Sequence, residues 1–154
     1  VALDVLLAES DFVSLHCPRN ASTEKMFDAS TFQAMKPGSI FVTTARGGIH
    51  SESALQEALE AGHLAGAGLD VWDVEPPPLD HPLLAMPNVV ATYHTAGVTH
   101  EARRNIASWA AEQLIDTLDG NMPARLVNPE AWAKYSERYE KIFGHKCAEC
   151  NPNL

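Results

Sequence analysis

Four side chains suited to acid–base or ion-pair chemistry follow apolar segments of this sequence. Arg46 comes directly after SIFVTTA, and His94 ends NVVATYH. Asp70 lies near the end of AGAGLDVW, and Glu75 lies in the loop that follows. In an open parallel sheet, ligands bind beyond the carboxyl ends of the strands. We therefore expect these four side chains to meet at one edge of a sheet.

The residue types suit one reaction. Oxidising a hydroxyl group needs a base for the O–H proton while a hydride leaves the carbon, and a histidine such as His94 suits that task near neutral pH. Glu75 would fix the tautomer of the ring and stabilise its charged form. The Arg46 guanidinium would hold a carboxylate with two hydrogen bonds and polarise the adjacent carbonyl. The set predicts hydride transfer between a nicotinamide cofactor and a small 2-hydroxy acid.

Each of these residues also has a structural interpretation when it is taken alone. Arg46 is then a solvated or ion-paired loop arginine, Glu75 a surface acid, and His94 a structural histidine. Asp70 could cap or hydrogen-bond the backbone. The remaining histidines are interpreted as structural or surface residues: His16, His50, His63, His81, His100 and His145. Only the joint placement at strand ends favours the catalytic interpretation.

Four apolar runs predict buried strands, at residues 11–17, 39–45, 65–72 and 88–94. They are continuous rather than alternating, and helices or long loops separate them. This pattern is typical of parallel strands that are buried on both faces, so we predict an α/β fold. The loop at 73–87 carries five prolines and cannot be regular throughout.

Local capping residues place the helices between and after these strands. Short helical segments are predicted at 3–8 and after Asp28 or Ser30. Ser51 caps a helix that Gly62 ends, and Thr99 caps a long one that Gly120 ends. The long helix carries an apolar stripe of Ile106, Trp109, Ala110, Leu114, Ile115 and Leu118. A last, more polar helix is predicted at 131–143.

Composition excludes several classes of protein. The chain has 154 residues, 45% of them hydrophobic, and a net charge of −9, which argues against nucleic acid or an anionic membrane as a partner. No apolar run approaches the ~20 residues that span a bilayer. Three cysteines are too few for a disulfide scaffold and suggest a reducing, cytoplasmic setting. The chain has no initiator Met and opens within a helical segment, so we expect it to begin inside a longer protein.

Four segments together resemble the C-terminal half of the D-isomer-specific 2-hydroxy acid dehydrogenases, a family that includes phosphoglycerate dehydrogenase and the glyoxylate/hydroxypyruvate reductases. The segments are SDFVSLHCP, MKPGSIFVTTARGG, AGAGLDVWDVEP and NVVATYHTAGVTHEA, in the family's order. The resemblance covers about residues 1–132. It implies a partial Rossmann-like, doubly wound parallel sheet, the second half of an NAD-binding domain, over 1–127. A helix at 128–144 would return toward the substrate domain, and 145–154 would be a flexible tail.

The resemblance also implies roles for individual residues. Arg46 would bind the substrate carboxylate and carbonyl, and His94 would be the acid/base with Glu75 as its partner. The implied cofactor is NAD, with NADP possible, and no metal is implied. Cofactor contacts would come from Cys17, Pro18, Thr44, Ala45, Arg46, Asp70, His94 and Gly97. The full-length protein would be a homodimer that uses the helix near 99–119.

Some features depart from the family or leave alternatives open. The family's GxGxxG turn and ribose-binding acid are not in these residues, so the chain holds half of a cofactor site. A non-catalytic, corepressor-like module that senses NAD is the alternative function. His145, Cys147 and Cys150 could bind zinc, although a structural zinc site needs four ligands and a chance cysteine pair is the alternative. The choice of 2-hydroxy acid is left open.

Overall fold

The computed structural model describes residues 1–148, which form two compact units. The first is Val1–Gly97, and the second begins at Val98. Part of the tail predicted to be flexible, residues 149–154, lies outside the described residues, as does Cys150. The domain division predicted at residue 128 stays a prediction.

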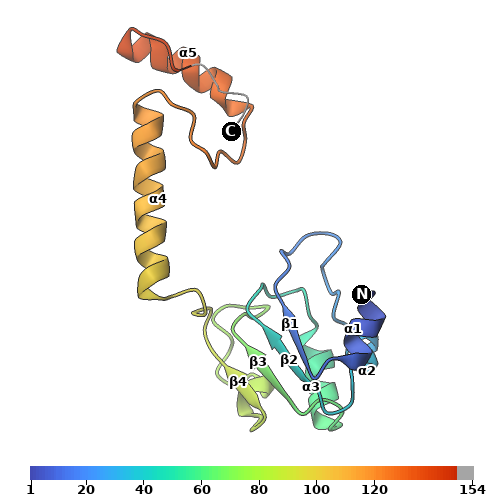
Figure 1. Ribbon diagram of the computed structural model, residues 1–154. Coiled ribbons are helices and arrows are strands. Elements are labelled where there is room, and N and C mark those ends of the chain that lie inside the picture. Colours follow the sequence, from blue (N-terminus) through green and yellow to red (C-terminus); the bar gives the residue numbers. More distant parts are fainter. Residues whose placement is uncertain (149–154) are drawn as a thin grey trace. The chain divides into compact units, whose positions relative to one another are not determined.

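The first unit is built on a four-stranded parallel sheet in the order β1-β2-β3-β4 (Figure 1). The register aligns Ser14 with Val42, Val42 with Gly68, and Gly68 with Val90. The strands are β1 Phe12–Leu15, β2 Ile40–Thr43, β3 Gly66–Leu69 and β4 Val89–Ala91. The predicted α/β fold with parallel strands is confirmed.

Two short helices with side-chain caps, α2 and α3, connect β1 to β2 and β2 to β3. The Asp28 carboxylate accepts a hydrogen bond from the Thr31 N–H at the start of α2, and the Ser51 hydroxyl accepts one from the Ala54 N–H at the start of α3. Both predicted caps are therefore present. The helices are α1 Leu3–Glu9, α2 Ala29–Ala34 and α3 Glu52–Glu60, and a single 3-10 turn, η1 Pro82–Ala85, interrupts the Pro-rich loop.

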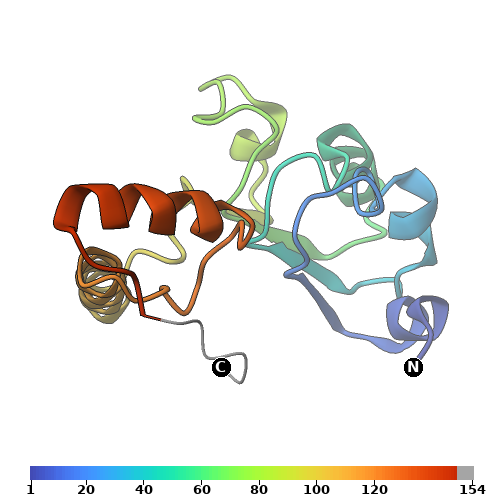
Figure 2. The same ribbon diagram turned by 90° about the horizontal axis from the view of Figure 1, so that it is seen from above.

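The core lies on one face of the sheet, where α2 and α3 pack (Figure 2). The rings of Phe27, Phe32 and Phe41 form its centre, with centroids 5.1 to 5.6 Å apart. The prediction that the strands are buried on both faces is wrong for the described residues, since Phe12 is 68% and Val90 73% exposed. The strands follow one another across the sheet in chain order. Right-handed crossovers between such parallel strands place every connecting helix on the same face.

Among residues 98–148, the second unit contains two helices, α4 His100–Leu118 and α5 Ala131–Phe143. Thr99 caps α4 as predicted, and Gly120 follows it with φ +78°. The Tyr135 hydroxyl donates to the Thr117 carbonyl at 2.6 Å. The apolar stripe of α4 is exposed, because no described residue of this helix is buried. None of the helices among residues 1–148 is both long and apolar enough to cross a membrane.

Candidate active site

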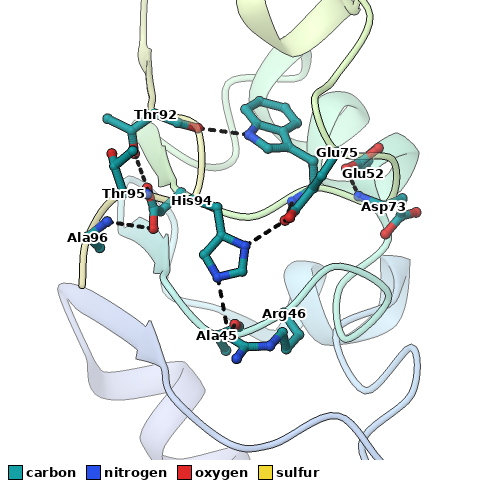
Figure 3. Close-up of polar contacts among 11 residues, drawn as sticks. Ala45, Arg46, Glu52, Asp73, Glu75, Thr92, His94, Thr95 and Ala96 are labelled. Carbon is teal, nitrogen blue, oxygen red and sulfur yellow. Dashed lines mark hydrogen bonds and ion pairs between the residues drawn. The ribbon is translucent and has the colours of Figure 1, made fainter. Parts of the chain in front are cut away.

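The imidazole of His94 lies between Glu75 and Arg46 (Figure 3). Its Nδ1 is 2.8 Å from Oε2 of Glu75, and its Nε2 is 3.5 Å from Nη1 of Arg46. These side chains follow β4, β3 and β2, so three neighbouring strand ends deliver them to one place. Since Arg46 can only donate, Nε2 accepts here and the proton lies on Nδ1, where it is donated to Glu75.

Glu75 is held by a second contact besides His94. Its Oε1 accepts from the Trp72 N–H at 3.1 Å, and the Trp72 indole N–H donates to the Thr92 carbonyl at 2.9 Å. The hydrogen bond with His94, followed by that from Trp72, holds the pKa of the Glu75 carboxyl below its usual value. The side chain is 37% exposed, so solvent screens part of this effect. Glu75 is therefore a carboxylate near neutral pH.

The turn that carries Arg46 depends on its two glycines. A Cβ at Gly47 would lie 1.9 Å from the Trp72 carbonyl oxygen, so only glycine lets the two segments pass this closely. Gly48 has φ +78°, and its N–H donates to Oδ1 of Asp73 at 2.6 Å. The turn is thus joined to the segment that leads to Glu75.

Glu52, in the first turn of α3, also supports the segment that leads from Trp72 to Glu75. Its Oε1 accepts from the Asp73 N–H at 2.7 Å (Figure 3), and its Oε2 lies 3.1 Å from Nε2 of His81. The His81 and Glu52 side chains are only 17% and 15% exposed. Sequence reasoning missed this contact and left His81 as structural or surface. The available signal was an acid that follows the helix cap directly, close to the glycine turn.

Asp70 organises the backbone around His94. Its Oδ1 accepts from the Thr92 hydroxyl and from the Thr95 N–H at 2.8 Å, and its Oδ2 accepts from the Ala96 N–H at 2.9 Å. Burial alone would raise the pKa of Asp70, but these hydrogen bonds together hold it below its usual value. Asp70 as a whole residue is 4% exposed. Its role toward a cofactor stays a prediction.

His94 itself has a backbone conformation that is uncommon for a residue with a side chain, with φ +55°. Such a conformation costs about 1–3 kcal/mol and persists only where its surroundings enforce it. The His94 N–H donates to the Asp70 carbonyl at 2.6 Å, and the carboxylate of Asp70 fixes the next two residues. Asp70 thus helps to aim the imidazole at Arg46 and Glu75.

A pocket of about 790 Å³ opens beside this set. Its lining is His16, Cys17, Pro18, Arg19, Thr44, Ala45, Arg46, Gly47, Trp72, Asp73 and Glu75. The predicted cofactor residues Cys17, Pro18, Thr44, Ala45 and Arg46 are among them, whereas Asp70, His94 and Gly97 are not. The pocket volume suits a nucleotide-sized ligand, and Ala45 in its lining adds only a methyl group. These residues fit part of a dinucleotide.

Metal-ligating side chains do not gather at any point of residues 1–148. No group of three or more His, Cys, Asp or Glu side chains within that range is placed to hold a metal ion. The zinc hypothesis for the tail stays untested, because Cys150 lies outside the described residues.

Residues 1–96 match a family model described as "D-isomer specific 2-hydroxyacid dehydrogenase, NAD binding domain". A glyoxylate/hydroxypyruvate reductase B from Escherichia fergusonii is 48% identical over 128 residues, which are 83% of this chain and 40% of that protein. The corresponding protein from Citrobacter koseri is 45% identical over the same length and covers the same shares of the two chains. The chain therefore spans about 40% of the length of these curated relatives.

Solved structures give the same result. A protein from Thermus thermophilus matches with a TM-score of 0.79 and 44% identity, over 82% of this chain and 40% of that one. A D-lactate dehydrogenase with NAD+ from Lactobacillus jensenii matches with a TM-score of 0.76 and 34% identity, over 82% and 42%. A D-isomer specific 2-hydroxyacid dehydrogenase from Xanthobacter autotrophicus Py2, in complex with NADPH, matches at 0.72 and 34%, over 84% and 53%.

Proposed function

Because this chain belongs to the D-isomer-specific 2-hydroxyacid dehydrogenase family, whose NAD-binding domain residues 1–96 match, we propose that it carries the acid–base half of an oxidoreductase. The enzyme transfers a hydride between a nicotinamide dinucleotide and a small 2-hydroxy or 2-oxo acid. The observation that carries this proposal is the His94 imidazole, which is bonded on Nδ1 to Glu75 and lies 3.5 Å from Arg46 on Nε2.

His94 moves the proton of the reaction. A bound reduced nicotinamide would supply the hydride for the carbonyl carbon. During reduction, protonated His94 gives the proton on Nε2 to the carbonyl oxygen. During oxidation Nε2 takes that proton back from the hydroxyl. Glu75 keeps Nδ1 protonated and stabilises the charged ring, as carboxylates do beside other catalytic histidines.

Arg46 positions the substrate, a 2-hydroxy or 2-oxo acid. One of its N–H groups is used by the Ala45 carbonyl at 2.6 Å, which holds the guanidinium over the pocket. Its remaining donors match the two oxygens of a carboxylate. A substrate oxygen bound to Arg46 then lies within reach of Nε2 of His94, because the two side chains are adjacent.

The residues that line the pocket would hold the cofactor. Thr44 and Ala45 would lie against its nicotinamide half, and Cys17 and Pro18 against its adenosine half. Asp70 and Gly97 would act nearby, since Asp70 fixes the backbone of residues 95 and 96. We propose NAD first and NADP second, which agrees with relatives that bind either dinucleotide.

Glyoxylate and hydroxypyruvate are the first substrates to test, because the relatives named above are reductases of these acids. The protein expressed from the intact gene should consume NADH in the presence of either acid, which the loss of NADH absorbance measures. If the protein binds NADH but turns over no small 2-oxo acid, the proposed activity is wrong and a binding module is favoured.

We further propose that the protein is a cytoplasmic homodimer. Its few cysteines suit a reducing compartment. The stripe on α4 exposes Ile106, Trp109, Leu114 and Ile115, each by 45% or more, as expected for a surface that a partner covers. Sedimentation should give a dimer for the protein, and a double Ile106→Glu, Leu114→Glu variant should be a monomer. Sedimentation of the unaltered protein as a monomer would contradict this proposal.

A further inference from the structure

Arg19 brings a second guanidinium to the pocket that contains Arg46. It lies in the loop after β1, and Arg46 follows β2, the neighbouring strand. Adjacent strands are about 4.8 Å apart, so one ligand beyond their carboxyl ends can reach both loops. Sequence reasoning did not single out Arg19.

The place that Arg19 occupies exists because residue 48 is glycine. A Cβ at Gly48 would lie 2.7 Å from Cζ of Arg19 and 3.0 Å from its Nε and Nη1. The planar group therefore rests against the backbone of the turn that carries Arg46. Any other residue at position 48 would displace it, and φ +78° there also favours glycine.

The guanidinium forms one ion pair, in which the Arg19 and Glu24 side chains are 50% and 53% exposed. Its Nη2 donates to Oε1 of Glu24 at 2.9 Å. The Lys25 N–H donates to the Gly48 carbonyl at 2.8 Å, which joins the Arg19 loop to the glycine turn. A guanidinium has five N–H donors, so the bond to Glu24 leaves others that can donate to a ligand.

The reaction described above does not require Arg19, because the other charged groups of the pocket already have partners. Of the two acids there, Asp73 accepts from the Gly48 N–H and Glu75 from His94. Arg46 suffices for the single carboxylate of a 2-oxo acid. A second cation on the lining of the pocket favours a ligand that carries a further negative group.

We propose that Arg19 is a second anion-binding residue of this pocket. It binds a carboxylate or phosphate other than the substrate carboxylate that Arg46 binds. This inference rests on the proposed function. The further group belongs either to the far end of the 2-oxo acid or to a phosphate of the dinucleotide. Both sources present the same anionic oxygens to the guanidinium.

The test compares Arg19→Leu and Arg19→Lys with unaltered protein from the intact gene. Calorimetry gives dissociation constants for glyoxylate, 2-oxoglutarate, NADH and NADPH without any need for turnover. Lys36→Gln is the matched control, because Lys36 also forms an exposed ion pair, with Asp11 at 2.6 Å, but does not line the pocket. Thermal unfolding of each variant verifies that it is folded.

Arg19→Leu should raise the dissociation constant of the ligand that carries the further anion by about tenfold or more relative to that of glyoxylate. The reason is that the variant loses charge-assisted hydrogen bonds to the anion. A selective loss for 2-oxoglutarate assigns Arg19 to the substrate, and a selective loss for NADH or NADPH assigns it to a cofactor phosphate. Arg19→Lys should show a smaller loss, because it keeps the charge without the planar fork. Lys36→Gln should leave the ratios unchanged.

Equal effects on all four ligands, or none, would overturn the role of Arg19. In that case continued turnover of glyoxylate by the unaltered protein would leave the proposed function standing. If the unaltered protein neither binds these ligands nor turns over a 2-oxo acid, both proposals are overturned.

Discussion

Nδ1 of His94 and Oε2 of Glu75 lie 2.8 Å apart, although one residue ends the segment after β4 and the other lies in the loop after β3. This contact orients the imidazole so that its other nitrogen faces Arg46. It also gives the ring a fixed negative partner that favours its protonated state. The remaining contacts of the site support one or the other of these two residues.

Replacing Glu75 by Gln should lower kcat by about 10² or more, with little change in KM, because the amide cannot stabilise the charged ring. Glu75→Asp should restore part of kcat, since it keeps the charge at a shorter reach. Steady-state kinetics with NADH and glyoxylate measures both. Equal kcat values for Glu75→Gln and the unaltered protein would show that the contact serves structure alone.

Replacing Arg46 by Gln should raise KM for the 2-oxo acid by about tenfold to a hundredfold, because two charge-assisted hydrogen bonds to the carboxylate are lost. Arg46→Lys keeps the charge but not the paired donors of the guanidinium, so its KM should lie between those of the unaltered protein and Arg46→Gln. Arg104→Gln, an exposed change on α4, is the control and should leave KM unchanged. An unchanged KM in Arg46→Gln would remove Arg46 from the substrate site.

Asp70→Asn should lower the free energy of unfolding by about 1–3 kcal/mol. Both oxygens of the carboxylate accept hydrogen bonds from backbone N–H groups, and the amide nitrogen of Asn would face one of these donors without accepting from it. The folded-state pKa of Asp70 is lowered, so its contribution is full above the ordinary value of about 3.9 and is lost as the pH falls below it. The stability of the variant should therefore depend less on pH below about 5.

Denaturant unfolding between about pH 2 and pH 7 measures this difference in slope. The same change at Asp80, an exposed loop residue, is the control. Parallel pH curves for Asp70→Asn and the unaltered protein would contradict the role given to these hydrogen bonds.

Glu52→Ala should lower the free energy of unfolding by about 1–3 kcal/mol and reduce kcat/KM, because the Asp73 N–H and His81 lose their acceptor. Hydrogen exchange at the Asp73 amide should become faster. Glu52→Gln keeps an oxygen for that amide and should recover most of both properties. Glu57→Ala, exposed on the same helix, should change neither, and similar effects at both positions would show that α3 in general is responsible.

Local features of the fold could be predicted from the sequence. The caps at Asp28, Ser51 and Thr99 depend on hydrogen bonds within one helical turn, and all three are present. The family resemblance is likewise confirmed. It could be recognised from the sequence because its four motifs are short continuous segments. The meeting of Arg46, Glu75 and His94 followed from one rule, that parallel strands present their carboxyl ends at one edge.

Other features could not be predicted, because they depend on contacts between distant segments. An apolar run does not show which side of a strand a helix will cover, so the exposure of Phe12 and Val90 was missed. The contact of Glu52 with Asp73 and the place of Arg19 over Gly48 both need the folded loops. Neither residue type nor spacing distinguishes them from surface charges.

The most direct test of the central claim is the kinetic effect of His94→Gln, measured together with the dissociation constant for NADH. Glutamine keeps hydrogen-bonding groups at this position but cannot exchange a proton near neutral pH. We predict that kcat falls by about 10²–10⁴ while the dissociation constant changes far less. A kcat equal to that of the unaltered protein would contradict the assignment of His94 as the acid–base group.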